Sequence, residues 1–277
     1  AGFDLPYERT DGGKAVEHIH PVDWDDPNAN DLRVVNQFPI AGKNDRRPDI
    51  IIFINGLPLV VFELKNPWSE KPTVDEALNQ IAHYRQDISQ LFDFNGLVVI
   101  SDGLETLHGM WTATKEWYAP WKSIDGNAIE PATIASMKML VEGLFQKARL
   151  LEYLRDFIVC ETANDVITKK GAKYHQFFAV KEAVARSLSA HRRVIAAASA
   201  DRRIGVIWHT TGSGKSLSIA FLVGILRRQS ELQNPSIVIQ VDRTDLDDQL
   251  HDQFVAARHL VGEVKHAISF EDLRNLL

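Results

Sequence analysis

The sequence predicts an α/β protein in which a mixed sheet flanked by helices is followed by a second, smaller α/β lobe. Two apolar runs, 50–54 and 57–62, flank Asn55-Gly56, which is the strongest short-range signal for a β-hairpin. Apolar residues at helical spacing follow over 74–91. Beyond about residue 174 the pattern changes to helix, strand, glycine-rich loop and helix, which is typical of a nucleotide-binding α/β unit.

Length and composition agree with two globular domains. The chain has 277 residues, 45% of them hydrophobic and 25% charged, and a net charge of −6. The net charge does not by itself indicate a nucleic-acid partner. We find no apolar run of transmembrane length and no signal-peptide pattern. The single cysteine, Cys160, excludes an internal disulfide, and we expect a cytoplasmic protein.

The other segments are read in chain order. Residues 1–30 show little periodicity, and Leu32 to Ile40 predicts a strand. Residues 96–103 predict a short buried strand, with 106–111 pairing beside it, and 132–158 predicts helices. The polar segment 161–173 is the candidate domain junction. We interpret four nearby aromatic residues as packing of a sheet edge in preference to base stacking: Trp111, Trp117, Tyr118 and Trp121.

Charged residues close both ends of the central hairpin. Asp49 precedes the first apolar run, and Glu63 and Lys65, which share a strand face, close the second. With a two-residue turn and a regular ladder, Asp49 falls opposite Phe62, on the wrong face for Glu63. A three-residue loop or one bulge instead pairs Asp49 with Glu63, and we predict this shifted register.

The predicted cluster has the chemistry of a hard-cation site. Carboxylate oxygens suit Mg²⁺, which keeps waters and takes one or two protein carboxylates. The alternative is a buried hairpin whose terminal charges are solvated. On the helix that follows, opened by Thr73 as N-cap, Gln80 and Tyr84 are four residues apart and therefore neighbours. Alone, this pair would be an ordinary edge of an amphipathic helix.

Asp49, Glu63-Leu64-Lys65 and the pair Gln80 and Tyr84 together resemble the PD-(D/E)xK nuclease core in its RecB-like form. The resemblance implies a restriction-endonuclease-like mixed sheet. It also implies that Asp49, Glu63 and the Leu64 carbonyl hold Mg²⁺ and that Lys65 orients or deprotonates water. By the same resemblance, Gln80 and Tyr84 position the DNA strand.

A phosphate-binding loop is predicted between a strand at 204–208 and a helix at 217–228. Its residues are Thr210, Thr211, Gly212, Ser213, Gly214, Lys215 and Ser216, with His209 where the full pattern has glycine. Backbone N–H groups of such a loop cradle phosphates at a helix N-terminus. Lys215 is expected to reach the β- and γ-phosphates of ATP, and the Ser216 hydroxyl to coordinate Mg²⁺.

Two further stretches resemble superfamily 2 helicases. Tyr174-His175-Gln176 precedes the loop by one helix, and Gln176 matches the adenine-reading glutamine of that family. Val241 to Leu250 follows a second predicted strand, 236–241, and resembles the motif that meets the DNA backbone, so that Arg243 and Thr244 are candidate DNA contacts. Asp245 as a helix N-cap is the structural alternative there. Nine Lys or Arg in 169–203 form either a solvated helix face or a phosphate-facing patch.

In this order, the motifs resemble the restriction subunit (HsdR) of type I restriction–modification enzymes. The resemblance implies an endonuclease domain over 1–158 and a first RecA-like helicase lobe over 159–277. It also implies cleavage of double-stranded DNA coupled to ATP-driven translocation, and modification (methyltransferase) and specificity subunits as partners. No Asp-Glu-x-His stretch, second lobe or arginine finger occurs before Leu277, so we expect the motor to need residues outside this chain.

Two other functions remain open from the sequence. One is an ATP-independent, Mg²⁺-dependent nuclease whose P-loop lobe is only a structural attachment. The other is a non-catalytic module that tethers DNA, with a vestigial acidic site. The intact set of Asp49, Glu63 and Lys65 weighs against the second.

Overall fold

A five-stranded mixed sheet organises the first half of the chain. The computed structural model describes residues 2–66, 68, 73–131, 134–163, 166–196 and 201–277. The strand order is β3-β4-β5-β6-β7, in which β5 and β6 are parallel and the other neighbours antiparallel. The strands are β3 (Leu32–Asn36), β4 (Ile50–Ile54), β5 (Leu57–Leu64), β6 (Leu97–Ser101) and β7 (Thr106–Gly109).

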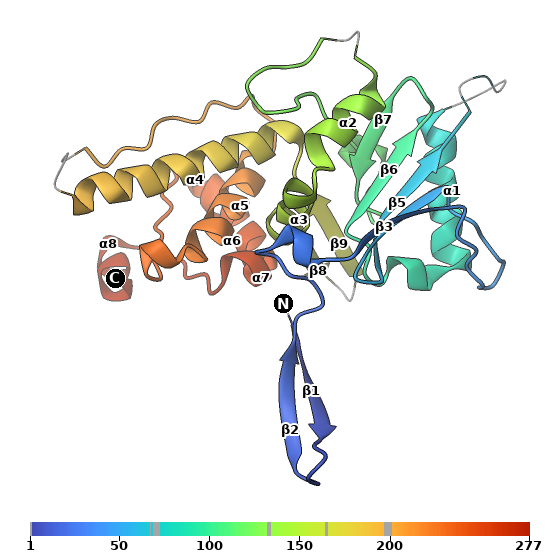
Figure 1. Ribbon diagram of the computed structural model, residues 1–277. Coiled ribbons are helices and arrows are strands. Elements are labelled where there is room, and N and C mark those ends of the chain that lie inside the picture. Colours follow the sequence, from blue (N-terminus) through green and yellow to red (C-terminus); the bar gives the residue numbers. More distant parts are fainter. Residues whose placement is uncertain (1, 67, 69–72, 132–133, 164–165, 197–200) are drawn as a thin grey trace.

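Helices cover both faces of this sheet (Figure 1). Helix α1 (Val74–Asp87) packs on the face formed by Ile51, Val61 and Val98, whereas α2 (Ser136–Leu144) and α3 (Lys147–Asp156) pack on the other. Burial on both faces explains why β4 to β6 are almost uninterrupted apolar runs. Thr73 caps α1 as expected, since its hydroxyl accepts from the Glu76 amide at 3.2 Å. Three short 3₁₀ turns connect the elements: η1 (Pro27–Ala29), η2 (Ser89–Phe92) and η3 (Lys115–Trp117).

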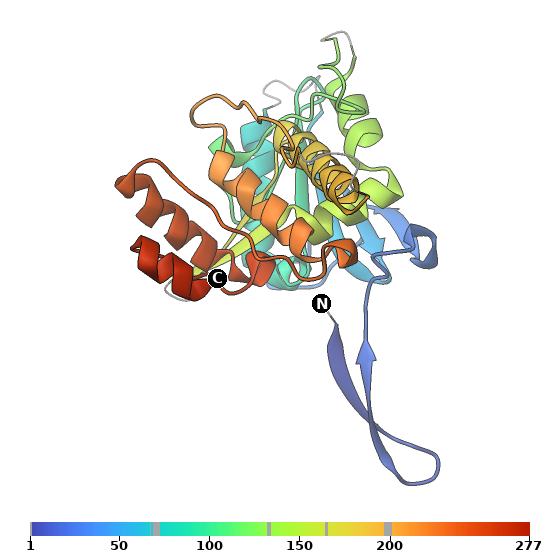
Figure 2. The ribbon, with the colours of Figure 1, turned by 90° about the vertical axis from the view of Figure 1, so that its left-hand side faces the viewer.

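The second half is mainly helical and shares a hydrophobic core with the first. The Phe157 ring lies 4.4 Å from that of Phe177 on α4 and 5.4 Å from that of Phe221 on α5, measured between centroids. Figure 2 shows α4 to α8 gathered beside the sheet. The elements are β8 (Ile158–Ala163), β9 (Val166–Gly171), α4 (Tyr174–Ile195), α5 (Lys215–Arg227), η4 (Ser230–Leu232), α6 (Thr244–Ala256), α7 (Arg258–Val261) and α8 (Phe270–Leu276).

The strands predicted at 204–208 and 236–241 are wrong. Neither segment pairs with a strand within the described ranges, and a strand needs a neighbour to satisfy its backbone hydrogen bonds. Their apolar side chains are correspondingly exposed, with Val206 at 92% and Trp208 at 88%. The lobe is a partial P-loop unit in which the helices are formed and the sheet is not.

Two other segments also differ from the sequence reading. Residues 1–30, which show little periodicity, contain the hairpin β1 (Phe3–Glu8) and β2 (Lys14–Ile19), which projects from the body in Figure 1. The predicted junction 161–173 is mostly the hairpin of β8 and β9, which lies between α3 and α4.

The aromatic cluster after β7 is mostly packing, as predicted. Trp121 is fully buried and Tyr118 is 6% exposed, whereas Trp117 is 54% exposed. No helix in the part of the chain that the structure describes is long and apolar enough to cross a membrane.

Candidate functional site

A bulge sets the register that brings the hairpin charges together. Asn55 and Gly56 form a two-residue turn with φ of +52° and +82°, and Ile54 pairs with Leu57. The register then shifts between Ile52 and Phe53, so that Ile52 pairs with Val60 and Ile50 with Phe62. Continued by one residue, this ladder places Asp49 beside Glu63, as the shifted register predicts.

Glu63 is a buried carboxylate held by two donors. It is 4% exposed and faces α1. Its Oε1 accepts from Lys65 Nζ and its Oε2 accepts from the Tyr84 hydroxyl, both at 2.8 Å. Burial raises the pKa of Glu63, and the contacts with Lys65 and Tyr84 oppose that rise. The pKa of Tyr84 is raised by burial and by the nearby charge of Glu63, so its hydroxyl stays a donor.

Gln80 lies at the outer end of this arrangement. It sits one helical turn before Tyr84 on α1 and is half-buried, and its side chain opposes the rise in the pKa of Tyr84. The structure therefore brings Glu63, Lys65, Gln80 and Tyr84 together on the α1 face of the sheet.

Asp49 is oriented by a residue that the sequence analysis missed. Its Oδ2 accepts from the Leu64 amide at 2.8 Å, and its Oδ1 accepts from Gln37 Nε2 at 2.7 Å. The Gln37 backbone amide also donates to the Asp49 carbonyl at 3.0 Å. Gln37 adopts φ of +50°, a conformation that costs a non-glycine residue free energy. No spacing rule links Gln37 to Asp49, since the contact depends on how β3 ends.

The oxygen ligands at this end of β4 and β5 fit a hard cation. Among the described residues, each oxygen of the Asp49 and Glu63 carboxylates accepts from one donor, which leaves a second lone pair on each oxygen for a ligand. Within the described residues no group of three or more His, Cys, Asp or Glu is placed to hold a metal. Mg²⁺ accepts one or two protein carboxylates and completes its shell with waters, whereas closed zinc and calcium sites take more protein ligands.

The predicted phosphate loop is a compact turn at the start of α5. Gly212 and Gly214 have φ of +79° and +80°, and the Ser213 hydroxyl donates to the Thr210 carbonyl at 2.7 Å. Lys215 Nζ donates to the carbonyls of His209 at 2.9 Å and Thr210 at 3.1 Å. The lysine side chain therefore lies across the loop. Thr211 is exposed and Ser216 half-buried at the helix start.

Gln176 braces this loop against α4. Its Oε1 accepts from the Lys173 amide at 2.8 Å and its Nε2 donates to the Gly214 carbonyl at 2.9 Å. Gly214 has φ of +80°, which L side chains rarely adopt, so glycine is strongly favoured there, and a Cβ would also lie 2.7 Å from Gln176 Nε2. The neighbouring His175 contacts the Ser213 carbonyl at 3.3 Å. Both ends of the Gln176 amide are engaged, so pairing with adenine needs their release.

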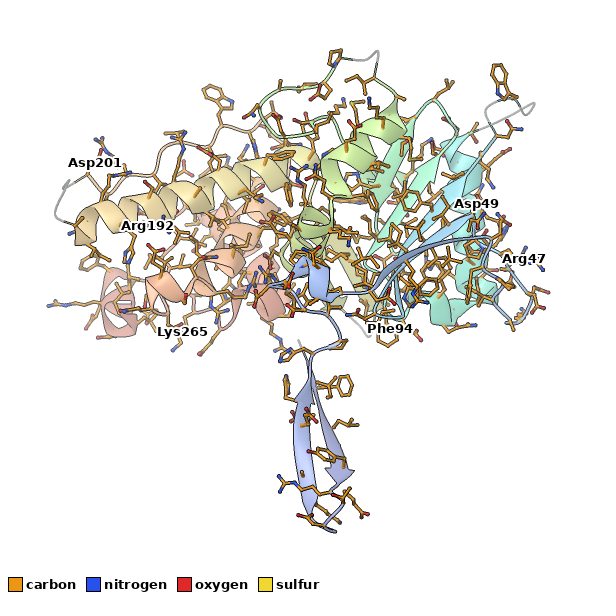
Figure 3. All side chains as sticks on the ribbon, viewed as in Figure 1. Arg47, Asp49, Phe94, Arg192, Asp201 and Lys265 are labelled. Atoms are coloured by element: carbon orange, nitrogen blue, oxygen red, sulfur yellow. The ribbon has the colours of Figure 1, made fainter. Side chains whose placement is uncertain are left out.

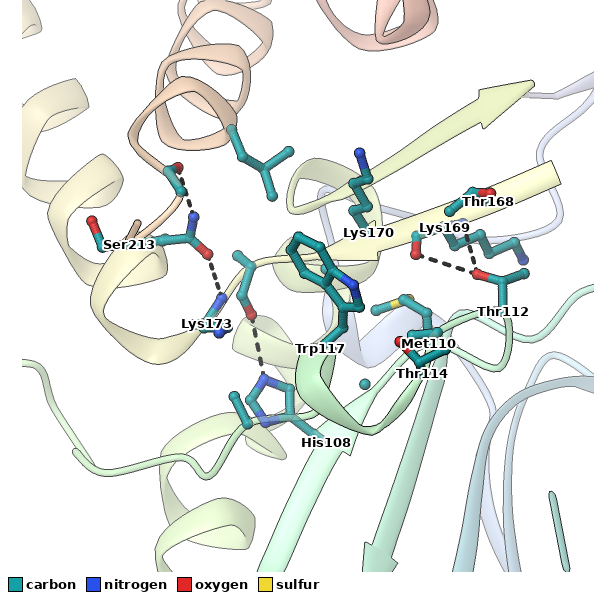
Figure 4. Close-up of a pocket in the computed structure, with 18 of the residues that line it drawn as sticks. His108, Met110, Thr112, Thr114, Trp117, Thr168, Lys169, Lys170, Lys173 and Ser213 are labelled. Atoms are coloured by element: carbon teal, nitrogen blue, oxygen red, sulfur yellow. Dashed lines mark hydrogen bonds between the residues drawn. The ribbon is translucent and has the colours of Figure 1, made fainter. Parts of the chain in front are cut away.

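A cavity of about 330 Å³ adjoins the loop and the sheet. Figure 4 shows Trp117 among Lys170 and Lys173, and Gln176 also lines the cavity. Gly212 to Gly214 line the cavity together with residues of β7 and β9. The candidate nucleotide loop and the nuclease-like sheet therefore border one space.

The remaining predicted contacts are at the surface. Arg243 and Thr244 are exposed, and α6 begins at Thr244, so Asp245 is not its N-cap. Most of the Lys and Arg side chains in 169–203 already have partners within the protein. This favours the interpretation of an ordinary charged helix face over that of a phosphate-facing patch. Their partners include Glu161 for Lys170, Glu152 for Lys181, Glu182 for Arg186, Glu231 for Arg192 and Asp201 for Arg203.

The fold and the two sites define a class of protein, namely an α/β chain with a restriction-endonuclease-like sheet followed by a partial P-loop lobe. Family comparisons agree. Residues 2–117 match the type I restriction enzyme R protein N terminus, and residues 175–277 match the SWI2/SNF2 ATPase family. Over the part that it spans, the chain belongs to the type I restriction enzyme R proteins.

Three relatives illustrate this similarity. The type I restriction enzyme HindI endonuclease subunit of Haemophilus influenzae is 40% identical over 96% of this chain and 25% of its own length. The putative MjaIXP endonuclease subunit of Methanocaldococcus jannaschii is 32% identical over 100% of this chain and 27% of its own. The SauCOLORF180P endonuclease subunit of Staphylococcus aureus is 28% identical over 81% of this chain and 22% of its own length. The chain thus spans about a quarter of the length of these proteins.

Proposed function

We propose that this chain carries the nuclease centre and the start of the ATPase motor of a type I restriction subunit, which cuts double-stranded DNA with Mg²⁺ and ATP. The observation that carries the proposal is the convergence of Asp49, Glu63 and Lys65 on one face of the sheet edge, with Tyr84 holding Glu63. A structural hairpin has no need of a buried glutamate that lies beside a lysine and a half-buried aspartate.

The roles follow from the geometry. Asp49, Glu63 and the Leu64 carbonyl would hold Mg²⁺, which when bound polarises a phosphodiester and lowers the pKa of a bound water. Lys65, 24% exposed and 2.8 Å from Glu63 Oε1, is placed to orient or deprotonate the attacking water and to stabilise negative charge on phosphorus oxygens. Tyr84 fixes the orientation of Glu63, and Gln80 extends this support toward the surface.

The second lobe would supply the coupling to ATP. Lys215 would exchange its two carbonyl contacts for phosphate oxygens, and Ser216 would reach the cation that accompanies ATP. Because Gln176 bonds the Gly214 carbonyl, movement of the loop is transmitted to the start of α4. Arg243 and Thr244 would contact the DNA backbone, and modification and specificity subunits would complete the assembly.

The direct test uses the full-length protein with those subunits and unmethylated circular DNA. Glu63→Ala and Lys65→Ala are each expected to abolish cleavage and to leave ATP hydrolysis intact. If either variant still cuts at the normal rate, the assignment of the nuclease centre is wrong. Loss of both cleavage and ATP hydrolysis would instead show that the substitution had disrupted the fold.

Experiments with the same protein and DNA distinguish two simpler functions. An ATP-independent nuclease would cut DNA with Mg²⁺ alone, without nucleotide. A tethering module would bind DNA yet give no signal on titration with Mg²⁺ or Mn²⁺.

A further inference from the structure

We propose that Lys43 and Arg47, on a loop clamped to the end of α1, form a contact site for DNA phosphates next to the nuclease centre. This inference rests on the proposed function and names the side chains that hold the substrate backbone there. The loop spans residues 40–47 and directly precedes Asp49.

The loop is held rigidly by one buried carboxylate. Asp87, 9% exposed, accepts from Asn44 Nδ2 at 2.7 Å and from Arg46 Nε and Nη2 at 2.8 and 2.6 Å. The Asp87 carbonyl accepts from the Lys43 amide at 2.8 Å. A forked arginine contact of this kind fixes geometry as well as charge.

Backbone contacts close the rest of the loop. Ile40 and Arg46 exchange hydrogen bonds of 2.9 and 3.0 Å, and Gln90 Nε2 donates to the Ala41 carbonyl at 2.7 Å. A Cβ at Gly42 would lie 2.0 Å from the Asp87 carbonyl oxygen, so the loop lies directly against the helix end. The same helix carries Tyr84, so the loop and the nuclease centre share one rigid support.

Arg46 is bound to Asp87, whereas the other two cations of the loop extend into solvent. Lys43 and Arg47 are exposed, and within the described residues neither side chain makes a hydrogen bond or ion pair, although the charge of Lys43 helps to lower the pKa of Asp87. Asp45 is the one acid of the loop, and its Oδ1 accepts from the Gly42 amide at 3.4 Å. A solvated charge needs no such anchoring, whereas a phosphate contact gains from a cation that is already positioned.

Arg47 also lies close to Asp49 of the nuclease centre. Arg47 lies two residues before Asp49, and the intervening Pro48 disfavours a helical backbone at Arg47, so the two residues are close along the chain. Pro48 itself is buried, and Figure 3 shows Arg47 and Asp49 at the same end of the molecule. A chain of net charge −6 whose nuclease centre is acidic needs local cations to attract a polyanion.

The test measures binding of the 277-residue chain to a fluorescent 30-base-pair duplex in EDTA at several salt concentrations. Each phosphate contact contributes about 0.9 to the slope of log affinity against log salt. Lys43→Gln with Arg47→Gln is therefore expected to reduce the slope by about 2, and Arg47→Lys to leave it nearly unchanged. Lys138→Gln is the control, because Lys138 is an exposed cation on α2, on the opposite face of the sheet, where it lies 3.8 Å from Glu142 Oε1.

An unchanged slope in the double variant, an equal loss in the Lys138 control, or no duplex binding by the unsubstituted chain would overturn the inference. The proposed nuclease is tested separately by cleavage with Glu63→Ala. Normal salt dependence in the loop variants with loss of cleavage in Glu63→Ala would refute only the phosphate contact. The reverse result would refute only the nuclease assignment.

Discussion

The contact between Tyr84 and Glu63 can be measured by a double-mutant cycle of unfolding free energies. The hydroxyl lies 2.8 Å from Glu63 Oε2, and the two residues are 3% and 4% exposed. A hydrogen bond to a charged group contributes about 1.5–3 kcal/mol. Combining Tyr84→Phe with Glu63→Ala should therefore destabilise the chain by about 1.5–3 kcal/mol less than the sum of the single variants.

The assay is urea unfolding at pH 7.5 followed by tryptophan fluorescence. Tyr118→Phe is the matched control, because its hydroxyl donates to the Met110 carbonyl at 3.1 Å and is buried away from Glu63. The Tyr118 and Glu63 variants should be additive to within about 0.5 kcal/mol. Additivity in the Tyr84 cycle as well would refute the reasoning, because it would mean that the hydroxyl and the carboxylate do not interact.

Three other predictions follow from single contacts. Gln37→Gly should keep the unfolding free energy within about 1 kcal/mol, since glycine relieves the positive φ, yet lower cleavage about tenfold to a hundredfold by freeing Asp49; equal cleavage would contradict this. Lys215→Ala should stop ATP hydrolysis in the full-length assembly and with it the cutting of unmethylated circular DNA; continued cutting without hydrolysis would exclude coupling. Burial lowers the pKa of His108 from 6.5 to about 4, so the unfolded chain binds a proton that the native state excludes as pH falls below 6.5. Stability should fall by about 2 kcal/mol between pH 7 and 5, measured by urea unfolding, and His108→Gln should remove that loss.

The nuclease-like half could be predicted because its signals are local. The two unbroken apolar runs, the Asn55-Gly56 turn and the spacing from Asp49 to Glu63 are properties of one short stretch. The shifted register was predicted because only that register places the carboxylates of Asp49 and Glu63 on one face of the hairpin. The position of the irregularity, between Ile52 and Phe53, depends on packing between strands, which no single stretch encodes.

The rest depended on contacts that are distant in sequence. Gln37 meets Asp49 across the β3–β4 pair, and the Asp87 clamp joins residues more than forty positions apart, at a separation of 43 for Asn44. The P-loop motif was recognisable from residue types alone, but the strands expected around it were not formed. Apolar character at Val206 and Trp208 predicts a strand only where neighbours complete the ladder.

The most direct test of the central claim is an anomalous-difference map from a crystal of this chain soaked in Mn²⁺. We expect one strong peak between the carboxylates of Asp49 and Glu63, with the Lys65 side chain still next to Glu63. A map with no peak beside Asp49 and Glu63, in crystals where no neighbouring molecule blocks this site, would contradict the account.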